Sequence, residues 1–292
     1  MKKVLFATTA LVATAAASSA FAAGHEGGVS LSMSADIGLF SYDGNLRWNN
    51  DFDLSWSAST VTDGGLTVAA SGSADDAGNQ SVSIAGGFGK LAIGDVDDGM
   101  DAALPGVPSD PTSGDDVGDD VANDDVTDGG LSGNSMLYTS PDLGGATAFF
   151  SYNFEGQTSG EGSTVDTGSA QLGVGVKAAV GDMTVGAGLT QDSDDNYIGV
   201  GADLGIAAVQ FRTGEVGGNT VSDLDLGAEI AAGAGTVGAN YSMDIENSES
   251  NGFGAWYTQG LGGGVNMTAA FWNSGDDDGD LNGFGVNLAA SF

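Results

Sequence analysis

Residues 46–60 read LRWNNDFDLSWSAST, and their side chains fall into two chemically different sets. The first set is apolar and takes alternate positions, with Asn50 as the exception: Trp48, Phe52, Leu54, Trp56 and Ala58. The second set is charged or polar: Arg47, Asn49, Asp51, Asp53, Ser55 and Ser57. Because successive side chains of a strand point to opposite faces, this stretch predicts a strand with one face toward lipid and the other toward water. Arg47, Asp51 and Asp53 are then candidates for the wall of a water-filled pore.

The same period of two recurs along the chain, for example over 29–40, where Val29, Leu31 and Met33 alternate with serines. Such alternation indicates a strand with one apolar and one polar face. About sixteen runs of this kind follow one another: 29–40, 46–60, 65–76, 80–86, 89–95, 134–141, 145–154, 169–180, 183–191, 196–204, 206–213, 222–231, 236–244, 250–258, 265–273 and 281–292. Roughly 270 residues suit a barrel of sixteen to eighteen strands, which leaves an aqueous channel. We therefore expect an all-β, antiparallel up-and-down transmembrane barrel.

The connections between these runs alternate in character. Every second connection is short and Gly-rich, as at 62–64 and 181–182, whereas most of the others are longer or acidic, as at 155–168 and 274–280. In an up-and-down barrel successive connections lie at opposite ends, so one end has tight turns and the other has acidic loops. Outer-membrane barrels have this asymmetry between periplasmic and extracellular ends. The last run alternates from Phe284 to the final residue, Phe292, which also fits such a barrel.

The longest connection, 95–133, reads DVDDGMDAALPGVPSDPTSGDDVGDDVANDDVTDGGLSG and has no strand period. It is rich in Asp and contains no Glu, Lys or Arg. Loops beyond ~12–15 residues without structure of their own are usually functional or disordered, and we expect this one to hang inside the barrel. Carboxylates in a narrow passage favour cations over anions. The candidates for this constriction are Asp97, Asp98, Asp101, Asp110, Asp115, Asp116, Asp119 and Asp120.

Calcium is a candidate ligand of the same loop. We expect that a channel of this kind requires no cofactor. Crowded carboxylates repel one another unless cations offset their charge, and Ca²⁺ takes oxygen ligands from carboxylates and carbonyls in flexible loops. The candidate ligands are Asp115, Asp116, Asp119 and Asp120. The spacing is not that of an EF-hand, and diffuse counterions or partly protonated carboxyls remain alternatives.

The first 22 residues have the features of a signal peptide. Lys2 and Lys3 precede an apolar run that is too short to span a bilayer, and Ala20-Phe21-Ala22 fits a cleavage site. We expect export, with 23–292 as one barrel domain. The chain holds 40 Asp and Glu against 6 Lys and Arg, a net charge of −34. Such a polyanion lacks the clustered basic residues that neutralise phosphates, so nucleic acid is not a partner.

The chain has few of the residue types that common catalytic sites require. There is no Cys, and His25 is the single His, so Ser-His-Asp, Cys-His and His-based zinc sites lack a component. We therefore expect no enzyme. Two alternatives stay open: an outer-membrane barrel hydrolase that works with carboxylates alone, and a secreted calcium-binding surface protein. The water-compatible second face of the strands, made of Gly, Ser, Thr, Asn and Asp, favours a pore over the secreted protein. The single His, the lack of a nucleophile with a base nearby and a length suited to an open pore disfavour the hydrolase.

Several segments carry a resemblance to a known family: MKKVLFATTALVATA at 1–15, the strand Val29–Ile37, FGKLAIGDVDDG at 88–99, Tyr138 to Pro141 followed by Gly144 and Gly145, and the terminal Phe292. In these the chain resembles the general porins of Gram-negative bacteria, most closely those of the Rhodobacter group. The resemblance implies a sixteen-stranded outer-membrane barrel, a homotrimer, and passive diffusion of small hydrophilic solutes and ions. It also implies that the third extracellular loop, here 95–133, folds into the barrel and narrows it.

The chain departs from this family in its basic residues. Family members set the loop acids against a basic cluster on the opposite wall. Here the second strand offers only Arg47 on its polar face, and the other basic residues after the signal peptide are Lys90, Lys177 and Arg212. We therefore expect a predominantly acidic, cation-preferring constriction.

Overall fold

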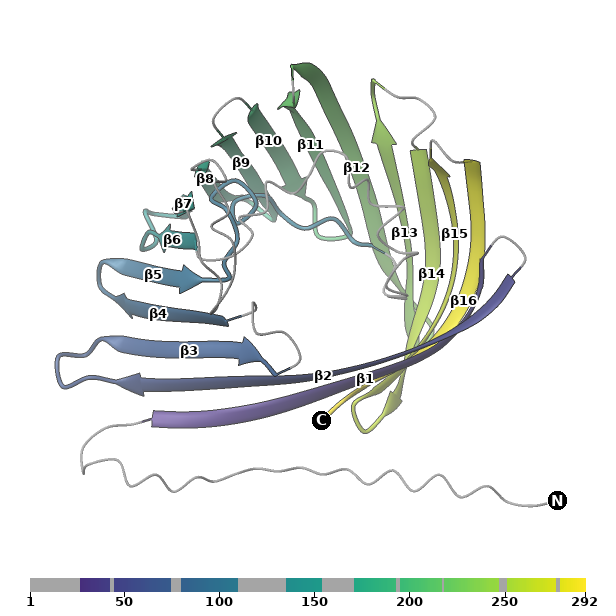
Figure 1. Ribbon diagram of the computed structural model, residues 1–292, viewed down its shortest axis with the longest axis horizontal. Helices are drawn as coiled ribbons and strands as arrows, with labels where there is room; N and C mark the ends of the chain where they lie inside the picture. The colour runs from purple at the N-terminus through teal and green to yellow at the C-terminus, as the bar shows by residue number, and fades with distance from the viewer. Residues whose placement is uncertain are drawn as a thin grey trace, which may run out of the picture.

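The computed structural model describes residues 27–42, 45–74, 80–109, 135–153, 171–192, 195–216, 218–246, 251–276 and 279–292. Within these ranges the chain forms a barrel of sixteen strands (Figure 1). Their bounds are β1 Gly27–Tyr42, β2 Asn45–Val61, β3 Thr67–Ser73, β4 Gln80–Gly86, β5 Gly89–Gly94, β6 Ser135–Thr139, β7 Ala146–Asn153, β8 Gln171–Val180, β9 Met183–Asp192, β10 Asp195–Asp203, β11 Ala207–Val216, β12 Asn219–Ala232, β13 Gly235–Asp244, β14 Asn251–Gly262, β15 Val265–Asp276 and β16 Gly279–Ser291. In the part of the chain that the structure describes, no helix is long and apolar enough to cross a membrane.

The barrel closes where β1 pairs with β16. Every strand is antiparallel to its sequence neighbours, and the ladder from Ser34↔Ser291 to Tyr42↔Gly283 joins the first strand to the last. The main chains of Phe292 and Met33 exchange two further hydrogen bonds, of 2.9 and 3.2 Å. The predicted up-and-down barrel of about sixteen strands is thus confirmed.

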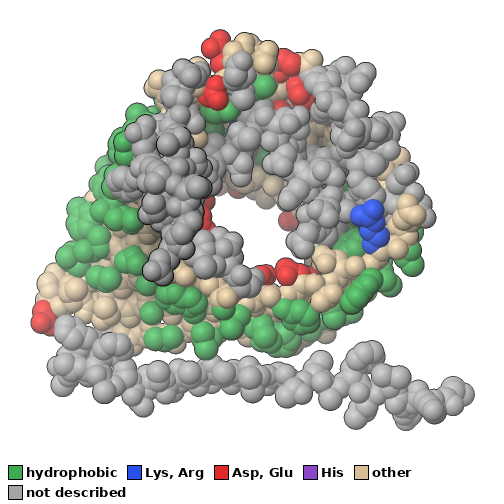
Figure 2. Space-filling model, in the orientation of Figure 1, with side chains coloured by type: hydrophobic (Ala, Val, Ile, Leu, Met, Phe, Trp, Pro, Cys, Tyr) green, Lys and Arg blue, Asp and Glu red, His purple; other side chains and the backbone are tan. Residues whose placement is uncertain are grey.

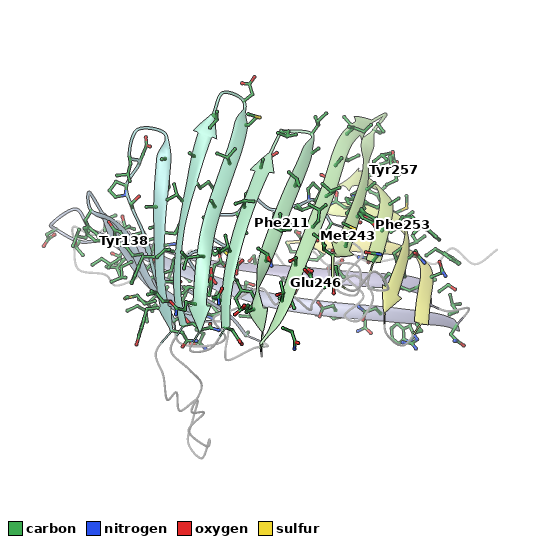
Figure 3. All side chains as sticks on the ribbon, turned by 90° about the horizontal axis from the view of Figure 1, so that it is seen from above. Tyr138, Phe211, Met243, Glu246, Phe253 and Tyr257 are labelled. Carbon is green, nitrogen blue, oxygen red and sulfur yellow. The ribbon has the colours of Figure 1, made fainter. Side chains whose placement is uncertain are left out.

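The outer face of the barrel is apolar, as the alternation predicts. On this face Trp48 is 71% exposed and Phe284 is 59% exposed. Phe253 and Phe271 pack against each other on neighbouring strands, with ring centroids 5.7 Å apart. Figure 3, which looks across the strands, shows Phe211, Met243 and Phe253 along this surface. A continuous exposed apolar face of this kind fits contact with lipid.

The strands at the acidic end run further than the alternation predicts. The stretches 42–45, 192–195, 214–220 and 274–280 are expected as loops, but in each of them the flanking strands leave only two residues between them. Hydrogen bonding between strands does not stop at the membrane surface, so paired strands continue through residues whose side chains no longer alternate. Hydrophobic periodicity therefore underestimates their length.

The wall has unequal height around the barrel. Strands β1 and β2 have 16 and 17 residues. Strands β3 and β4 have 7 residues each, β5 has 6 and β6 has 5. A strand needs ~9–11 residues to cross the hydrocarbon core of a bilayer. The arc from β3 to β6 is therefore a low section of the wall.

A cluster of aromatic side chains on the inner face supports the closure. Phe40 of β1, Trp256 of β14 and Trp272 of β15 are buried there together. The strand between β1 and β15 carries glycine on this face, and a Cβ at Gly283 or Gly285 would overlap Trp272 or Phe40. The rings of Phe40 and Trp272 therefore meet across β16, with centroids 6.2 Å apart. This contact ties the first strand to the fifteenth.

Candidate functional site

After β5 the chain turns into the barrel instead of crossing directly to β6. The segment Asp95–Ser109 runs along the inner wall past β7 to β12 (Figure 1). At its start, the Gly99 amide donates to Ser151 Oγ of β7 at 2.8 Å. Further along, Gln210 Nε2 of β11 donates to the Pro105 carbonyl at 2.5 Å. We call this segment the inward loop.

Beneath the inward loop, the inner face of the wall carries glycines. On this inner face β8, β9 and β10 each carry two glycines separated by one residue: Gly173, Gly175, Gly186, Gly188, Gly199 and Gly201. A Cβ added at any of these positions would overlap the loop or a neighbouring strand; at Gly188 it would lie 2.7 Å from Met100 Cα. The glycines allow the loop backbone to approach the strand backbones directly. The loop is therefore fitted to this arc of wall.

Asp98 fixes the beginning of the inward loop. Its side chain is fully buried, and its Oδ1 accepts the amide hydrogens of Met100 at 2.5 Å and Asp101 at 2.8 Å. Its Oδ2 accepts the hydroxyl hydrogen of Thr190 on β9 at 2.5 Å. Burial raises the pKa of Asp98 above its ordinary value of 3.8, and these hydrogen bonds, together with the more distant Arg212, oppose the rise.

A small apolar cluster holds the middle of the loop. Met100 and Leu104 are buried against Tyr197 of β10, and Val221 of β12 packs at the edge of this cluster. Side chains of these types remove apolar area from water when they pack together. The loop is thus attached to the wall by apolar contact as well as by hydrogen bonds.

One basic side chain lies beside the loop among acids. Arg212 of β11 is 4.0 Å from Asp101, and its Nη2 donates to Gln210 Oε1 at 3.1 Å. Across the strand pair, Arg212 lies directly opposite Asp223, a buried residue of β12. The positive charge of Arg212 is therefore partly balanced within the wall.

Carboxylates line the channel on two separate arcs of the wall. On β1 and β2, Asp36 lies directly opposite Asp51, and Asp36 accepts from Asn287 Nδ2 at 2.9 Å. On β12 and β13 the inward positions include Asp223, Asp225, Glu229 and Asp244. Figure 2 looks into the barrel and shows an open central passage with acidic side chains at its rim. Among the described residues of the inner face, acidic side chains therefore outnumber basic ones.

The predicted site residues differ in burial and in their contacts. Asp97 is exposed, Asp101 is partly buried beside Arg212, and Asp98 is buried in the junction between loop and wall, away from the channel surface. Arg47, Asp51 and Asp53 lie on the inner face of β2. The remaining predicted loop acids lie outside the described residues: Asp110, Asp115, Asp116, Asp119 and Asp120. So do the signal peptide 1–22 and the candidate calcium ligands. Within the described residues, no group of three or more His, Cys, Asp or Glu could hold a metal ion.

Further acids of the inner face are not among the predicted site residues. Asp36, Asp225 and Asp244 lie partly exposed on the inner face, and Asp223 lies buried on the same face. The alternation of Asp223 and Asp225 with Leu224 and Leu226 was a signal that could have found two of them. No sequence signal pointed to Thr190, because its role depends on Asp98, a loop residue 92 positions earlier in the chain.

The family model and the solved structures described next are all of porins. A family model described as "Gram-negative porin" matches residues 7–279. Among curated proteins, none matches. Among solved structures, a porin refined at 1.8 Å resolution has a TM-score of 0.68 at 19% identity, covering 91% of this chain and 100% of its own. An anion-selective porin from Comamonas acidovorans has a TM-score of 0.66 at 19% identity with the same coverage. A mutant porin from Rhodopseudomonas blastica has a TM-score of 0.57 at 15% identity, covering 90% of this chain and 100% of its own.

Proposed function

The chain belongs to the Gram-negative porins, the outer-membrane barrels through which small solutes diffuse passively, and from this premise we propose that its channel prefers cations to anions. Porins are channels rather than enzymes, which sets aside the hydrolase alternative. A secreted soluble protein is likewise set aside by the lipid-facing barrel.

The charge of the channel lining is the observation that carries this proposal. Carboxylates lie on the β1–β2 arc and on the β12–β13 arc, while the described basic residues are Arg47, Lys90, Lys177 and Arg212. Arg212 is beside Asp101 and opposite Asp223. Such a lining lowers the electrostatic energy of a cation in the passage and raises that of an anion. At ~0.15 M salt the screening length is ~8 Å, so charges at the narrowest section dominate.

Reversal potential under a KCl gradient tests the proposal. The purified protein is inserted in a planar bilayer, and the sign of the zero-current potential reports which ion permeates more easily. We expect a clear K⁺ preference that decreases when Asp97 is changed to Asn together with Asp51 and Asp53. Weak selectivity or Cl⁻ preference would leave a porin but reject an acidic constriction. A Cl⁻ preference would resemble the selectivity stated for the Comamonas acidovorans porin.

We also propose that the protein is a homotrimer, as its resemblance to porins implies. The low section of wall from β3 to β6 supports this assembly, because strands of 5–7 residues are too short to face lipid across a whole bilayer. The outer face of this section carries apolar side chains such as Val82 and Ile93, which suits contact with another copy of the chain. Cross-linking in the native membrane should give a three-copy species. A purely monomeric pattern would reject this assembly.

We propose calcium binding at Asp115, Asp116, Asp119 and Asp120 on sequence grounds alone. The support is the density of carboxylates, which are ligands that Ca²⁺ prefers. Isothermal titration with CaCl₂ tests it: saturable binding should be lost when these four residues become Asn, and equal binding by both proteins would reject this site.

A further inference from the structure

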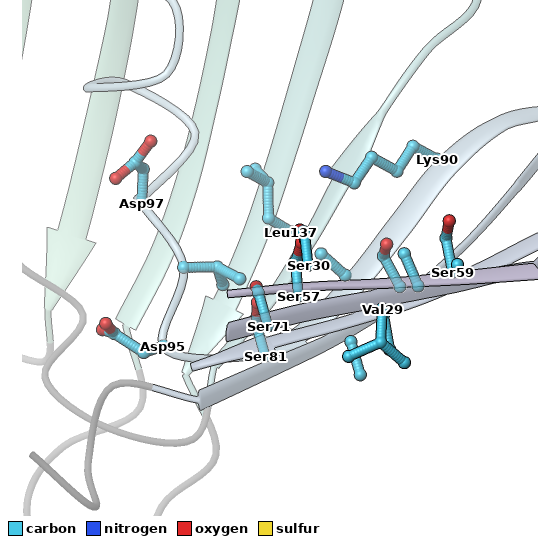
Figure 4. A pocket seen from close by; sticks show the side chains of 17 residues that line it. Val29, Ser30, Ser57, Ser59, Ser71, Ser81, Lys90, Asp95, Asp97 and Leu137 are labelled. Carbon is cyan, nitrogen blue, oxygen red and sulfur yellow. The ribbon is translucent and has the colours of Figure 1, made fainter. Parts of the chain in front are cut away.

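A cavity of about 650 Å³ lies between the root of the inward loop and the inner face of β1 to β5. Its floor is a row of four serines at directly paired positions on four neighbouring strands: Ser30, Ser57, Ser71 and Ser81. Their hydroxyls are in contact, with Oγ–Oγ distances of 2.6 Å for Ser30–Ser57 and 3.1 Å for Ser71–Ser81. In Figure 4 these hydroxyls project into the cavity, whereas Val29 points to the other side of the sheet. We call this cavity the serine groove.

The serine groove has a positive group and two negative groups on its border. Lys90 of β5 is exposed and reaches over the groove, and Asp95 and Asp97 of the inward loop are exposed on another part of the same lining (Figure 4). Lys90 lies next to the β4–β5 turn, whereas Asp95 and Asp97 follow the other end of β5. The groove therefore has an ammonium toward one end of the strand and carboxylates toward the other, with neutral hydroxyls between them.

We propose that the serine groove is a subsite for small zwitterionic solutes of the amino-acid class, which it concentrates inside the channel. The carboxylate of such a solute faces Lys90 and its ammonium faces Asp97. The serine hydroxyls, which both donate and accept hydrogen bonds, replace part of the water around the two charged groups. This inference rests on the proposed porin function and names a solute class for it.

Charge complementarity favours a zwitterion over an uncharged polyol in this groove. Exchange of a hydrogen bond with water for one with a serine hydroxyl yields little net free energy, so a hydroxyl surface alone does not concentrate a sugar. An ammonium and carboxylates on different parts of the lining do orient and attract a solute with the opposite arrangement of charges. The volume is within the usual range of small-molecule sites.

Swelling of proteoliposomes tests the proposal, with L-threonine as the zwitterionic probe and erythritol as a neutral probe of similar size. We expect the ratio of the threonine swelling rate to the erythritol swelling rate to be roughly two- to five-fold higher in the wild type than in the Lys90→Gln or Asp97→Asn variant. This is the size of effect expected from the loss of one solvent-exposed charge contact. Erythritol swelling shows that each variant still forms an open barrel.

Lys177→Gln is the matched control, because it removes the same charge from the inner face of β8, outside the groove. It should shift the ion selectivity without the fall in the threonine ratio. A double variant that exchanges the charges, Lys90→Asp with Asp97→Lys, should recover the ratio. Equal threonine-to-erythritol ratios in the wild type and in all variants would overturn the subsite. A double variant Ser30→Ala with Ser57→Ala that loses only erythritol flux would also overturn it, because that result would indicate a site for polyols. Absence of swelling with both probes would instead reject the porin function.

Discussion

The hydroxyl of Thr190 donates a hydrogen bond of 2.5 Å to Asp98 Oδ2, which joins the inward loop to β9 of the barrel wall. Both side chains are fully buried. The other carboxylate oxygen of Asp98 accepts two amide hydrogens from the loop itself. Asp98 thus organises the first turn of the loop and attaches that turn to β9. This one contact therefore helps to hold the inward loop against the inner wall of the barrel.

Removal of the Thr190 hydroxyl should loosen the inward loop. In Thr190→Val a buried carboxylate oxygen loses its donor, which costs ~1–3 kcal/mol in the docked state. We expect single-channel recordings to show higher or more variable conductance. Thr190→Ser keeps the hydroxyl and should behave as the wild type. A Thr190→Val channel with the conductance and noise of the wild type would contradict an anchoring role.

Acid should strengthen, not weaken, this attachment. Burial raises the pKa of Asp98, so the docked loop binds a proton more tightly than the undocked loop. By linkage, docking becomes more favourable as pH falls through the raised pKa, and the gain is complete below the ordinary value of 3.8. Conductance noise from loop motion should therefore decrease between neutral pH and pH 3.8.

Asp98→Asn provides the matched test of this pH effect. The amide oxygen can accept the two loop amide hydrogens and the amide nitrogen can donate to Thr190, so docking should persist at neutral pH. The pH dependence of the noise should be much smaller in this variant. The assignment would be wrong if wild type and Asp98→Asn changed equally with pH.

The glycines under the loop should be intolerant of a methyl group. In Gly186→Ala the new Cβ would overlap the Ala103 carbonyl, so the loop must move away from the wall. We expect altered single-channel conductance with a folded barrel. Gly28→Ala serves as the control, because a Cβ at that inner-face position meets no atom within 4 Å. If both variants had the same conductance as the wild type, close backbone packing would not position the loop.

Ion preference should depend on the wall acids and on salt. Changing Asp51 and Asp53 to Asn should reduce the K⁺ preference in reversal-potential measurements. The preference should be largest at ~0.01 M KCl, where the screening length is ~30 Å, and smallest at ~1 M, where it is ~3 Å. Asp182→Asn removes one charge from the β8–β9 turn instead and should have a smaller effect than either wall substitution. A preference independent of salt would contradict an origin in solvent-exposed wall charges.

The aromatic contact across the barrel closure should contribute to stability. Phe40→Ala removes a buried ring that packs on Trp272, and such truncations cost ~3–5 kcal/mol. Urea unfolding in detergent should show a lower midpoint. Phe52→Ala, which truncates an exposed ring on the outer face, should lower the midpoint less in micelles. Equal midpoints for Phe40→Ala and the wild type would indicate that the closure does not depend on this contact.

Much of the barrel could be predicted from the alternation of side chains, because the period of a strand is written in adjacent residues. The faces of β2 illustrate this: Trp48 and Phe52 lie outside, and Asp51 and Asp53 lie inside, as predicted. Strand ends were less predictable. The ladders of β12 and β15 continue past the residues whose polarity suggested loops, because main-chain pairing does not require an apolar side chain.

The candidate site was only partly predictable. The sequence identified an acidic loop, but Asp97 and Asp98 are adjacent in it and have different surroundings: one is exposed at the serine groove, and the other is buried against Thr190. Local composition contains nothing that distinguishes these two carboxylates. Their difference comes from the strands that the loop meets.

By itself, then, the sequence determined a membrane barrel with a polar interior, an acidic lining and an unusually long third loop, because these follow from local alternation, composition and order along the chain. The tertiary structure decided which acids face the channel, where glycine admits the loop backbone, and that Ser30, Ser57, Ser71 and Ser81 form one row beside Lys90 and Asp97. These are relations between residues far apart in the chain. They depend on the register between strands and on the closure of β1 onto β16, and neither is recorded in any single stretch of sequence.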